Sequence, residues 1–337
     1  MGKAKPLSDI RILLAESDLQ LGIMLQQVLQ RMGFKSVQLV RDGELAVEAL
    51  QREQKDILIT EWQLQALDGI SVTHHVRRQG PPENRLLPII MMTARAERQD
   101  VEVARDAGIT EFVVKPYNST TVFRRIQQVI DNPRGFLLAQ QYVGPDRRRR
   151  NAVISEERRQ IVPKITFQPE VLDVPDVPQL ILPDYLLKQK LGDVDSLDKL
   201  ITPQVLAEAQ QVIDGLRDES LQWIRKDVQQ LNMLYRQLLQ GGDNAVREQI
   251  CTVLLSIKAH AGTFGYENAS RLAQQLYQFM RFDFVLGSSR HNHVLLKHIQ
   301  SITVLLRHQA EGRTMDKENW LMQALSQLVA RFKQDKA

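Results

Sequence analysis

The chain has 337 residues, of which 43% are hydrophobic, and its 44 basic side chains nearly balance 40 acidic ones. That length suits two domains with separate cores, and the small net charge gives no general argument for a nucleic-acid partner. The single cysteine, Cys251, excludes an intrachain disulfide, and no apolar run approaches the roughly 18 residues of a membrane span. The short charged start leaves no room for a secretory signal, so we expect a soluble, cytoplasmic protein.

Residues 11–131 alternate short apolar runs with amphipathic segments, a pattern typical of a parallel sheet that helices cover on both faces. This succession predicts one doubly wound α/β domain with a five-stranded parallel sheet, over residues 1–132. Strands are predicted at 10–15, 36–40, 56–60, 88–93 and 111–115, and helices at about 18–32, 43–53, 70–79, 97–107 and 119–131.

The next stretch, residues 133–201, is rich in proline and arginine. Proline removes a backbone donor and interrupts helices and central strands. The prolines at positions 163, 169, 175, 178 and 183 therefore predict an extended linker that can dock along the surface, with room for a short helix within 184–201.

From Thr202 onward the apolar spacing becomes helical. Thr202 suits an N-cap and Pro203 the first helical position. Leu295, Ile299 and Ile302 follow the spacing of a core face. Residues 202–337 should form an all-α helical bundle, with helices up to about 240 and at 244–264, 268–282, 290–309 and 316–332.

Polar residues stand where the apolar runs of the first domain end. Glu16 and Ser17 follow the first run, and Glu61 follows the third. Thr93 ends the fourth run, and Lys115 ends the fifth. Because ligands of doubly wound sheets bind at the carboxyl ends of the strands, these five residues are the candidate site.

Sequence motifs around these positions resemble the receiver domain of bacterial response regulators, over roughly residues 8–131. In chain order they read ILLAESD, DILITEWQLQALDG, IIMMTA and FVVKPY. The resemblance implies the flavodoxin-like version of the doubly wound fold. It also implies a role in two-component signalling.

The resemblance shows where this chain departs from working receivers, which hold Mg²⁺ on an acidic pair and accept a phosphoryl group on an aspartate. Here the pair reads Glu16-Ser17, and the acceptor position is Glu61. Mg²⁺ needs closely placed oxygen anions, and the nucleophile must lie in line with the donor phosphate. One lost carboxylate and one added methylene therefore predict a degenerate pocket, without metal and without phosphorylation.

Three other residues match the family. Thr93 and Lys115 stand where receivers sense and neutralise the phosphoryl group, and Phe112 stands at the place of the rotating switch aromatic. Glu61 has two interpretations: a permanent partial mimic of phosphoaspartate that reaches Lys115, or one half of a buried ion pair left after catalysis was lost. Asp18 could replace the missing metal ligand, but its register favours a solvated side chain.

The segment CTVLLSIKAHAGTFGYENASRLAQQL, residues 251–276, resembles the phosphoacceptor hairpin of histidine phosphotransfer (HPt) domains. Lys258, Ala259 and Gly262 fill the family's positions three, four and seven residues after the histidine, but Leu255 occupies the histidine position. Helical periodicity places Leu255 opposite the core stripe, so we expect an apolar spot that faces a partner, another helix or solvent. These four residues are the predicted HPt-like docking face, on which Lys258 would be an ordinary surface cation.

Other basic and imidazole groups give weaker signals. His260 lies on the core flank, which favours a packed, hydrogen-bonded side chain, and the remaining histidines have no companion cysteines. We therefore expect neither a metal nor another cofactor. The linker carries a basic patch, which is either solvated or internally paired, or else docks an acidic protein surface or phosphates, including nucleic acid or a cyclic dinucleotide. That patch consists of Arg147, Arg148, Arg149 and Arg150.

Two acceptor positions, Glu61 and Leu255, are thus changed while their surroundings persist. This predicts a non-enzymatic adaptor in a bacterial phosphorelay, a pseudo-receiver joined to an HPt-like domain, which binds a histidine kinase, a response regulator or a phosphotransferase. One alternative is residual phosphotransfer through Glu61, Asp18 or His260. The other is a regulator that binds nucleic acid or a nucleotide through the arginine patch, although nucleic acid is the less expected partner. The oligomeric state does not follow from the sequence.

Overall fold

The computed structural model of the chain describes residues 7–147, 164–165, 178–182, 185–192, 194–310, 323–325 and 327. The chain divides into two compact units. The first comprises Met1–Val114 with Asn118–Val212, and the second comprises Lys115–Tyr117 with Ile213–Ala337. Across the described ranges, none of the helices combines the length and the apolar character that a bilayer span requires.

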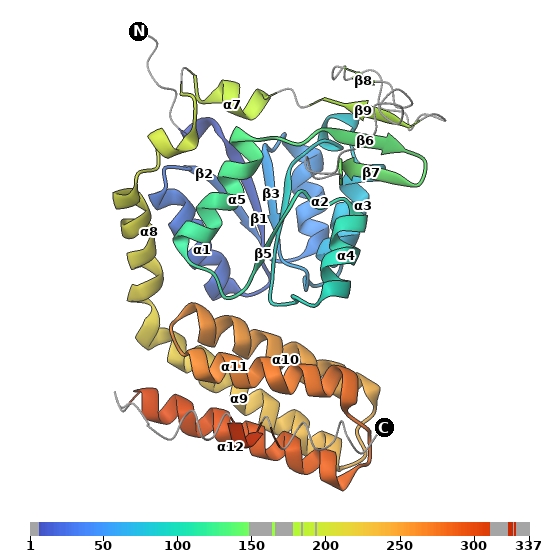
Figure 1. The fold of residues 1–337 in the computed structure, drawn as a ribbon, viewed down its shortest axis with the longest axis vertical. Coiled ribbons are helices and arrows are strands. Elements are labelled where there is room, and N and C mark those ends of the chain that lie inside the picture. Colours follow the sequence, from blue (N-terminus) through green and yellow to red (C-terminus); the bar gives the residue numbers. More distant parts are fainter. Residues whose placement is uncertain are drawn as a thin grey trace. The chain divides into compact units, whose positions relative to one another are not determined.

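The first unit is built on a five-stranded parallel sheet with the strand order β2-β1-β3-β4-β5 (Figure 1). The predicted doubly wound domain is confirmed, because short apolar runs form the strands and the amphipathic segments between them form the covering helices. The strands are β1 (Arg11–Ala15), β2 (Ser36–Val40), β3 (Ile57–Thr60), β4 (Ile89–Thr93) and β5 (Glu111–Val114), and the helices are α1 (Leu19–Arg31), α2 (Gly43–Arg52), α3 (Gly69–Arg78), α4 (Arg98–Ala107) and α5 (Ser119–Asp131).

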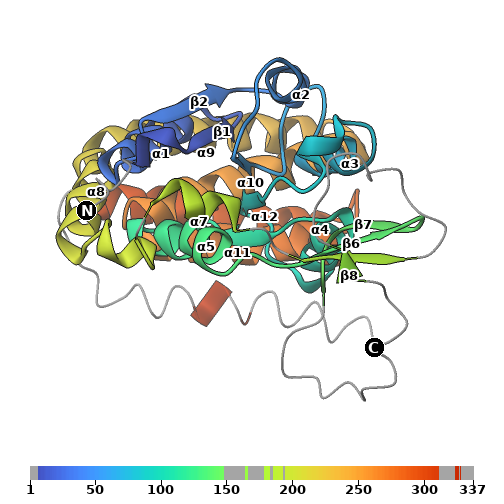
Figure 2. The same ribbon diagram turned by 90° about the horizontal axis from the view of Figure 1, so that it is seen from above.

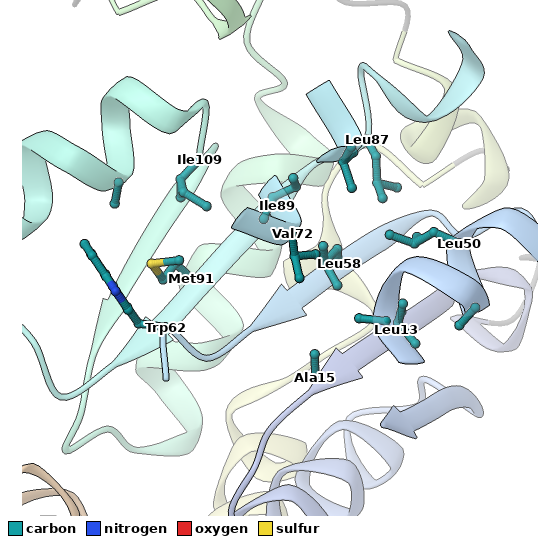
Figure 3. Packing of buried hydrophobic residues seen from close by; sticks show 14 residues of the cluster. Leu13, Ala15, Leu50, Leu58, Trp62, Val72, Leu87, Ile89, Met91 and Ile109 are labelled. Carbon is teal, nitrogen blue, oxygen red and sulfur yellow. The ribbon is translucent and has the colours of Figure 1, made fainter. Parts of the chain in front are cut away.

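A hydrophobic core joins the sheet to the helices on one of its faces (Figure 3). Leu13, Leu58 and Met91 come from three neighbouring strands and pack with Val72 of α3. Trp62, the second residue after β3, belongs to the same cluster. Because each large buried apolar side chain stabilises the fold by about 1.5–3 kcal/mol, this core fixes the strand ends that carry the candidate site.

A second, smaller sheet lies within the predicted linker, so residues 136–145 and 179–181 form paired strands where an unpaired linker was predicted. Phe136, Leu138, Val143 and Ile181 form its own small core. The prolines that suggested a linker all come after the hairpin of residues 136–145, and Pro178 directly precedes the strand at 179–181. The two-residue turn of that hairpin, Gln140-Gln141, lacks the glycine or asparagine that usually marks one. The strands are β6 (Phe136–Ala139), β7 (Tyr142–Pro145), β8 (Lys164–Ile165) and β9 (Gln179–Ile181), in the order β7-β6-β9-β8.

The chain from residue 185 to 215 is mostly helical. The short helix expected within 184–201 is present as α7 (Leu186–Lys190), which contacts α5, and the view from above in Figure 2 shows the two together. α8 (Pro203–Gly215) begins at the predicted proline, and the Thr202 hydroxyl accepts a hydrogen bond from the Val205 amide at 3.4 Å. The Ser119 hydroxyl of α5 donates to the Leu206 carbonyl at 2.9 Å, so most of α8 belongs to the first unit, unlike the predicted boundary at 202.

The second unit is a helical region in which α9, α10, α11 and α12 pack against one another. Its helices are α9 (Arg217–Leu239), α10 (Asn244–Thr263), α11 (Glu267–Gln278) and α12 (Ser289–Ala310), and a π-helical turn, Phe279–Asp283, extends α11. The predicted stripe is buried: Leu295, Ile299 and Ile302 are at most 1% exposed. The helix predicted at 316–332 falls outside the described residues, except for helical Gln323–Leu325 and Gln327.

Candidate functional site

Strand register brings two acidic residues to the carboxyl edge of the sheet. Ala15 of β1 pairs with Thr60 of β3, so Glu16 and Glu61 follow at neighbouring strand ends. The Glu61 amide donates to the Ala15 carbonyl at 2.9 Å. Both side chains are buried, with Glu16 4% and Glu61 8% exposed. Glu16 and Glu61 therefore follow adjacent strands at the same edge of the sheet.

The Glu61 carboxylate turns back onto the loop that follows it. Its Oε1 accepts hydrogen bonds from the backbone amides of Trp62, at 2.6 Å, and Gln63, at 3.4 Å. Hydrogen bonds to an ionised acceptor are stronger than those between neutral groups. One carboxylate oxygen at the acceptor position is thus engaged by the protein's own backbone.

Ser17 holds the same loop from the neighbouring strand end. Its hydroxyl donates to the Gln63 carbonyl at 2.8 Å. Asp18 is the N-cap of α1 and accepts from the Leu21 amide at 3.0 Å. A cap of this kind stabilises a helix by about 1 kcal/mol, so the Asp18 carboxylate has a structural role where a solvated side chain was predicted.

A glycine allows α3 to begin directly against this loop. The Gly69 amide donates to the Trp62 carbonyl at 2.9 Å, and Asp68 caps α3 by accepting from the Ser71 amide at 2.7 Å. A Cβ atom on Gly69 would lie 2.1 Å from the Glu61 carbonyl oxygen, a distance that no side chain tolerates. The Asp-Gly pair therefore fixes the backbone around Glu61.

The residues of this edge do not fit the Mg²⁺ site of a working receiver. Mg²⁺ prefers oxygen ligands in near-octahedral geometry. The Gln63 carbonyl is bound by the Ser17 hydroxyl, and Oε1 of Glu61 is bound by backbone amides. Within the part of the chain that the structure describes, no three His, Cys, Asp or Glu side chains gather where they could hold a metal ion.

The other predicted residues of the pocket follow the next two strands. Thr93 is buried at the end of β4, and its hydroxyl accepts from the Arg95 amide at 3.2 Å. The Arg95 guanidinium lies over the Trp62 ring, 5.5 Å from its centroid. Lys115 follows β5 and is 3% exposed, and Phe112 packs half-buried against the core cluster. Arg95 and Trp62 were not predicted from the sequence, although a cation and an aromatic residue so close to two strand ends were a usable signal.

Residues 12–127 match the family model of the response regulator receiver domain. The N-terminal part of this chain is a response regulator receiver domain. Chemotaxis protein CheY of Pseudomonas aeruginosa is 27% identical over 126 residues, which are 37% of this chain and 100% of that protein. Chemotaxis protein CheY-3 of Vibrio cholerae is 25% identical over 123 residues, 36% of this chain and 93% of that protein. The receiver domain indicates a role in two-component signalling.

Among solved structures, the receiver domain is similar to the chemotaxis response regulator CheY4 of Vibrio cholerae. The sequence identity is 24% and the TM-score is 0.34. The similarity covers 36% of this chain and 98% of that structure.

The four residues of the predicted HPt-like docking face lie on α10. Leu255, Lys258 and Ala259 are 2%, 7% and 4% exposed, so the expectation that Lys258 is a surface cation is wrong. The Ser270 hydroxyl of α11 donates to the Lys258 carbonyl at 2.8 Å, and a Cβ on Gly262 would lie 2.8 Å from that hydroxyl oxygen. The small residue at 262 thus lets a neighbouring helix approach closely.

His260 is a packed, hydrogen-bonded core residue, as predicted. It is 3% exposed, and its Nδ1 lies 2.8 Å from Oδ2 of Asp227 and 3.3 Å from the Ser256 hydroxyl. The Ser256 hydroxyl also donates to Oδ2 of Asp227, at 2.9 Å. Because serine and histidine share one carboxylate oxygen, the cluster ties α9 to α10 and is not arranged as a nucleophile with its base.

Arg147 is the one member of the arginine patch within the described residues. Its guanidinium lies 3.0 Å from the Asp106 carboxylate of α4 and 3.8 Å from the centroid of the Tyr142 ring. This arginine is therefore internally paired. Arg148, Arg149 and Arg150 lie outside the described residues.

The arginine that organises the edge opposite the candidate site, Arg77 of α3, was not singled out from the sequence. It is 1% exposed and donates to the carbonyls of Gly108, at 3.0 and 2.9 Å, and of Arg85 and Leu87, both at 2.7 Å. It also lies 5.0 Å from the centroid of the Phe136 ring in β6. Burial lowers the pKa of Arg77 to about 9. A basic residue at the end of an amphipathic helix looks like a solvated side chain in sequence.

Proposed function

We propose that the chain is a non-catalytic adaptor of two-component signalling, which binds a histidine kinase, a response regulator or a phosphotransferase without being phosphorylated itself. One observation carries the proposal. The Ser17 hydroxyl holds the Gln63 carbonyl while the Glu61 carboxylate accepts from the amides of Trp62 and Gln63. The groups at the positions where a receiver binds its metal and attacks a phosphoryl donor thus form hydrogen bonds within the loop that follows β3.

The position of the Glu61 carboxylate argues against its use as a nucleophile. Phosphoryl transfer depends on positioning, because the attacking oxygen must lie in line with the leaving group. A displacement of about 1 Å costs a positioned reaction on the order of 100-fold. The additional methylene of glutamate and its hydrogen bonds to the loop both move the carboxylate away from the place of an aspartate.

The helical region supports the same function, because its altered position also lacks an acceptor. Leu255 stands where the HPt-like pattern requires a histidine, and its side chain has no atom that can take a phosphoryl group. In this proposal the region binds partners as a phosphotransfer domain does, but it does not accept or pass on a phosphoryl group. His260 does not substitute, because it is 3% exposed and packed between α9 and α10, out of reach of a phosphoryl donor.

The first test is mass spectrometry of the intact full chain after incubation with acetyl phosphate and Mg²⁺. We expect no phosphoryl adduct. A stoichiometric adduct that disappears when Glu61 is replaced by alanine would contradict the proposal and establish residual phosphotransfer.

The matched control is the double variant Ser17→Asp with Glu61→Asp, which restores a second acidic side chain after β1 and an aspartate after β3. We expect this variant to become labelled in a Mg²⁺-dependent manner, because Thr93 and Lys115 are retained. Labelling of the variant alone would show that the native chain is inert because of these two positions, and that the reaction conditions are adequate.

The adaptor function itself is tested by capturing partners with the immobilised full chain. The chain is treated with acetyl phosphate in one sample, before the partners are added, and is left untreated in the other. We expect kinases or response regulators to be captured equally in both conditions. Capture that requires treatment of the chain with acetyl phosphate would contradict a phosphorylation-independent role.

A further inference from the structure

A cavity of about 530 Å³ lies at the amino-terminal edge of the receiver sheet, the edge opposite Glu61. Its lining includes Asp56, Pro88 and Thr110, which immediately precede β3, β4 and β5. α7 and the strands β6 and β9 lie along this edge in Figure 1. All lining residues belong to the first compact unit. The cavity is therefore built jointly by the receiver domain and the segment that follows it.

The walls of the cavity are mainly apolar. Leu87 and Val129 contribute from the receiver domain, and Phe136 and Ile181 from the small sheet. Leu186 of α7 stands in the lining and is 51% exposed, a large exposed fraction for a leucine. Cavities of about 300–1,000 Å³ with apolar walls and a few polar groups are typical of small-molecule sites.

The charged residues of the lining carry a positive excess. Lys55, Arg134 and Lys190 line the cavity, against Asp56 and Glu83. The Asp56 carboxylate lies 2.7 Å from the Lys190 ammonium and 3.2 Å from Nε of Arg11, which stands outside the lining. Asp56, the buried carboxylate of the lining, is thus already paired with two cations.

The other two cations have acidic partners that stand outside the cavity. Lys55 pairs with Glu53 at 2.6 Å, and Arg134 pairs with Glu111 at 3.1 Å. Neither glutamate belongs to the lining. The Arg134 side chain is 41% exposed, so its guanidinium can also meet a ligand in solution.

We propose that this cavity binds a small amphiphilic anion, an apolar chain that ends in a carboxylate. The chain would occupy the space between Leu87, Val129 and Leu186, and the carboxylate would lie near Arg134. Because α7 and β9 form part of the wall, an occupant would contact the receiver domain and the following segment at once. Binding would stabilise their association, and it would give this receiver a chemical input that is independent of phosphate.

The test is calorimetric titration of the full chain with octanoate, and in parallel with octanol, which has the same chain without the charge. We expect octanoate to bind saturably with one equivalent per chain and to raise the melting temperature. Octanol should bind more weakly. Absence of saturable octanoate binding, or equal affinity for both compounds, would overturn the proposal.

Two pairs of variants locate the site. Leu186→Asp should weaken octanoate binding by about tenfold or more, because it puts a negative charge into the wall, whereas Leu239→Asp, at a leucine of α9 that is 52% exposed, should leave it unchanged. Arg134→Gln should weaken octanoate several-fold and leave octanol unchanged, whereas Arg124→Gln, at an exposed arginine of α5, should have no effect. Circular dichroism checks the fold of each variant, and equal effects within either pair would contradict the assigned position.

Discussion

The two edges of one parallel sheet are used in different ways. At the carboxyl edge, Ser17 and Glu61 form hydrogen bonds with the loop that follows β3. At the amino edge, Asp56 binds Lys190, a residue 134 positions later, and a cavity remains between the sheet and that later segment. In one domain, a loop can thus be held tightly at one edge of the sheet while the other edge, together with the following segment, encloses a cavity.

The largest effect is expected at the amino edge from Arg77→Met. The variant leaves the carbonyls of Gly108, Arg85 and Leu87 without their buried donor, and each unsatisfied group costs about 1–3 kcal/mol. We expect the free energy of unfolding to fall by about 3–5 kcal/mol in urea denaturation. Arg78→Met, at the exposed neighbour, is the control and should cost less than about 1 kcal/mol. A small effect of Arg77→Met would mean that the three carbonyls find other donors once the guanidinium is removed.

At the carboxyl edge, Gly69→Ala should destabilise the receiver domain by about 1–3 kcal/mol, because the added methyl group meets the Glu61 carbonyl. Thermal unfolding followed by circular dichroism measures the change. The matched control is Gly215→Ala near the end of α8, where a Cβ meets nothing within 4 Å. That substitution should be neutral or stabilising, and a loss of stability in both variants would argue against a specific contact at Gly69.

A smaller, pH-dependent effect is expected from Asp56→Asn. Burial alone would raise the pKa of Asp56, but hydrogen bonds from Arg11 and Lys190 outweigh it and hold the pKa below the ordinary value of 3.8. A carboxyl with a lowered pKa stabilises the fold above its unfolded value and loses that contribution as the pH falls through its folded value. We expect Asp56→Asn to cost about 1–2 kcal/mol at neutral pH.

The pH dependence of this variant distinguishes an ion pair from a packing effect. Urea denaturation at a series of pH values should show the difference between Asp56→Asn and the native chain shrinking below about pH 4. A difference that persists unchanged in acid would show that the charge of Asp56 does not hold Arg11 and Lys190.

The smallest effect on stability is expected from Glu61→Gln, which keeps an oxygen that can accept from the Trp62 amide but removes the charge. The free energy of unfolding should change by less than about 1 kcal/mol. If Glu61 mimics phosphoaspartate, the dissociation constant for the captured partner should shift. Glu44→Gln on α2 serves as the control for the loss of one negative charge. An unchanged dissociation constant after Glu61→Gln would favour the interpretation of Glu61 as one half of a buried ion pair.

The sequence predicted the receiver fold well, because helices and parallel strands each leave a periodic pattern of apolar residues. It placed Glu16 and Glu61 at strand ends of one candidate site, because ligands of doubly wound sheets bind at the carboxyl ends of the strands. It did not predict the hydrogen bond from Ser17 to Gln63, which joins two loops 46 residues apart and has no local pattern. The cavity was missed for a related reason, since prolines further along the segment outweighed the short apolar runs of β6 and β9.

The hydrogen bond between Ser17 and Gln63 makes the two changed positions of the candidate site depend on each other. Ser17→Asp alone would put a second acidic side chain beside a glutamate that still reaches the Trp62 amide, and Glu61→Asp alone would leave the serine hydroxyl on the Gln63 carbonyl. In the proposed function, either single substitution would therefore leave one of the two contacts with the loop in place, and the double variant would be needed to remove both.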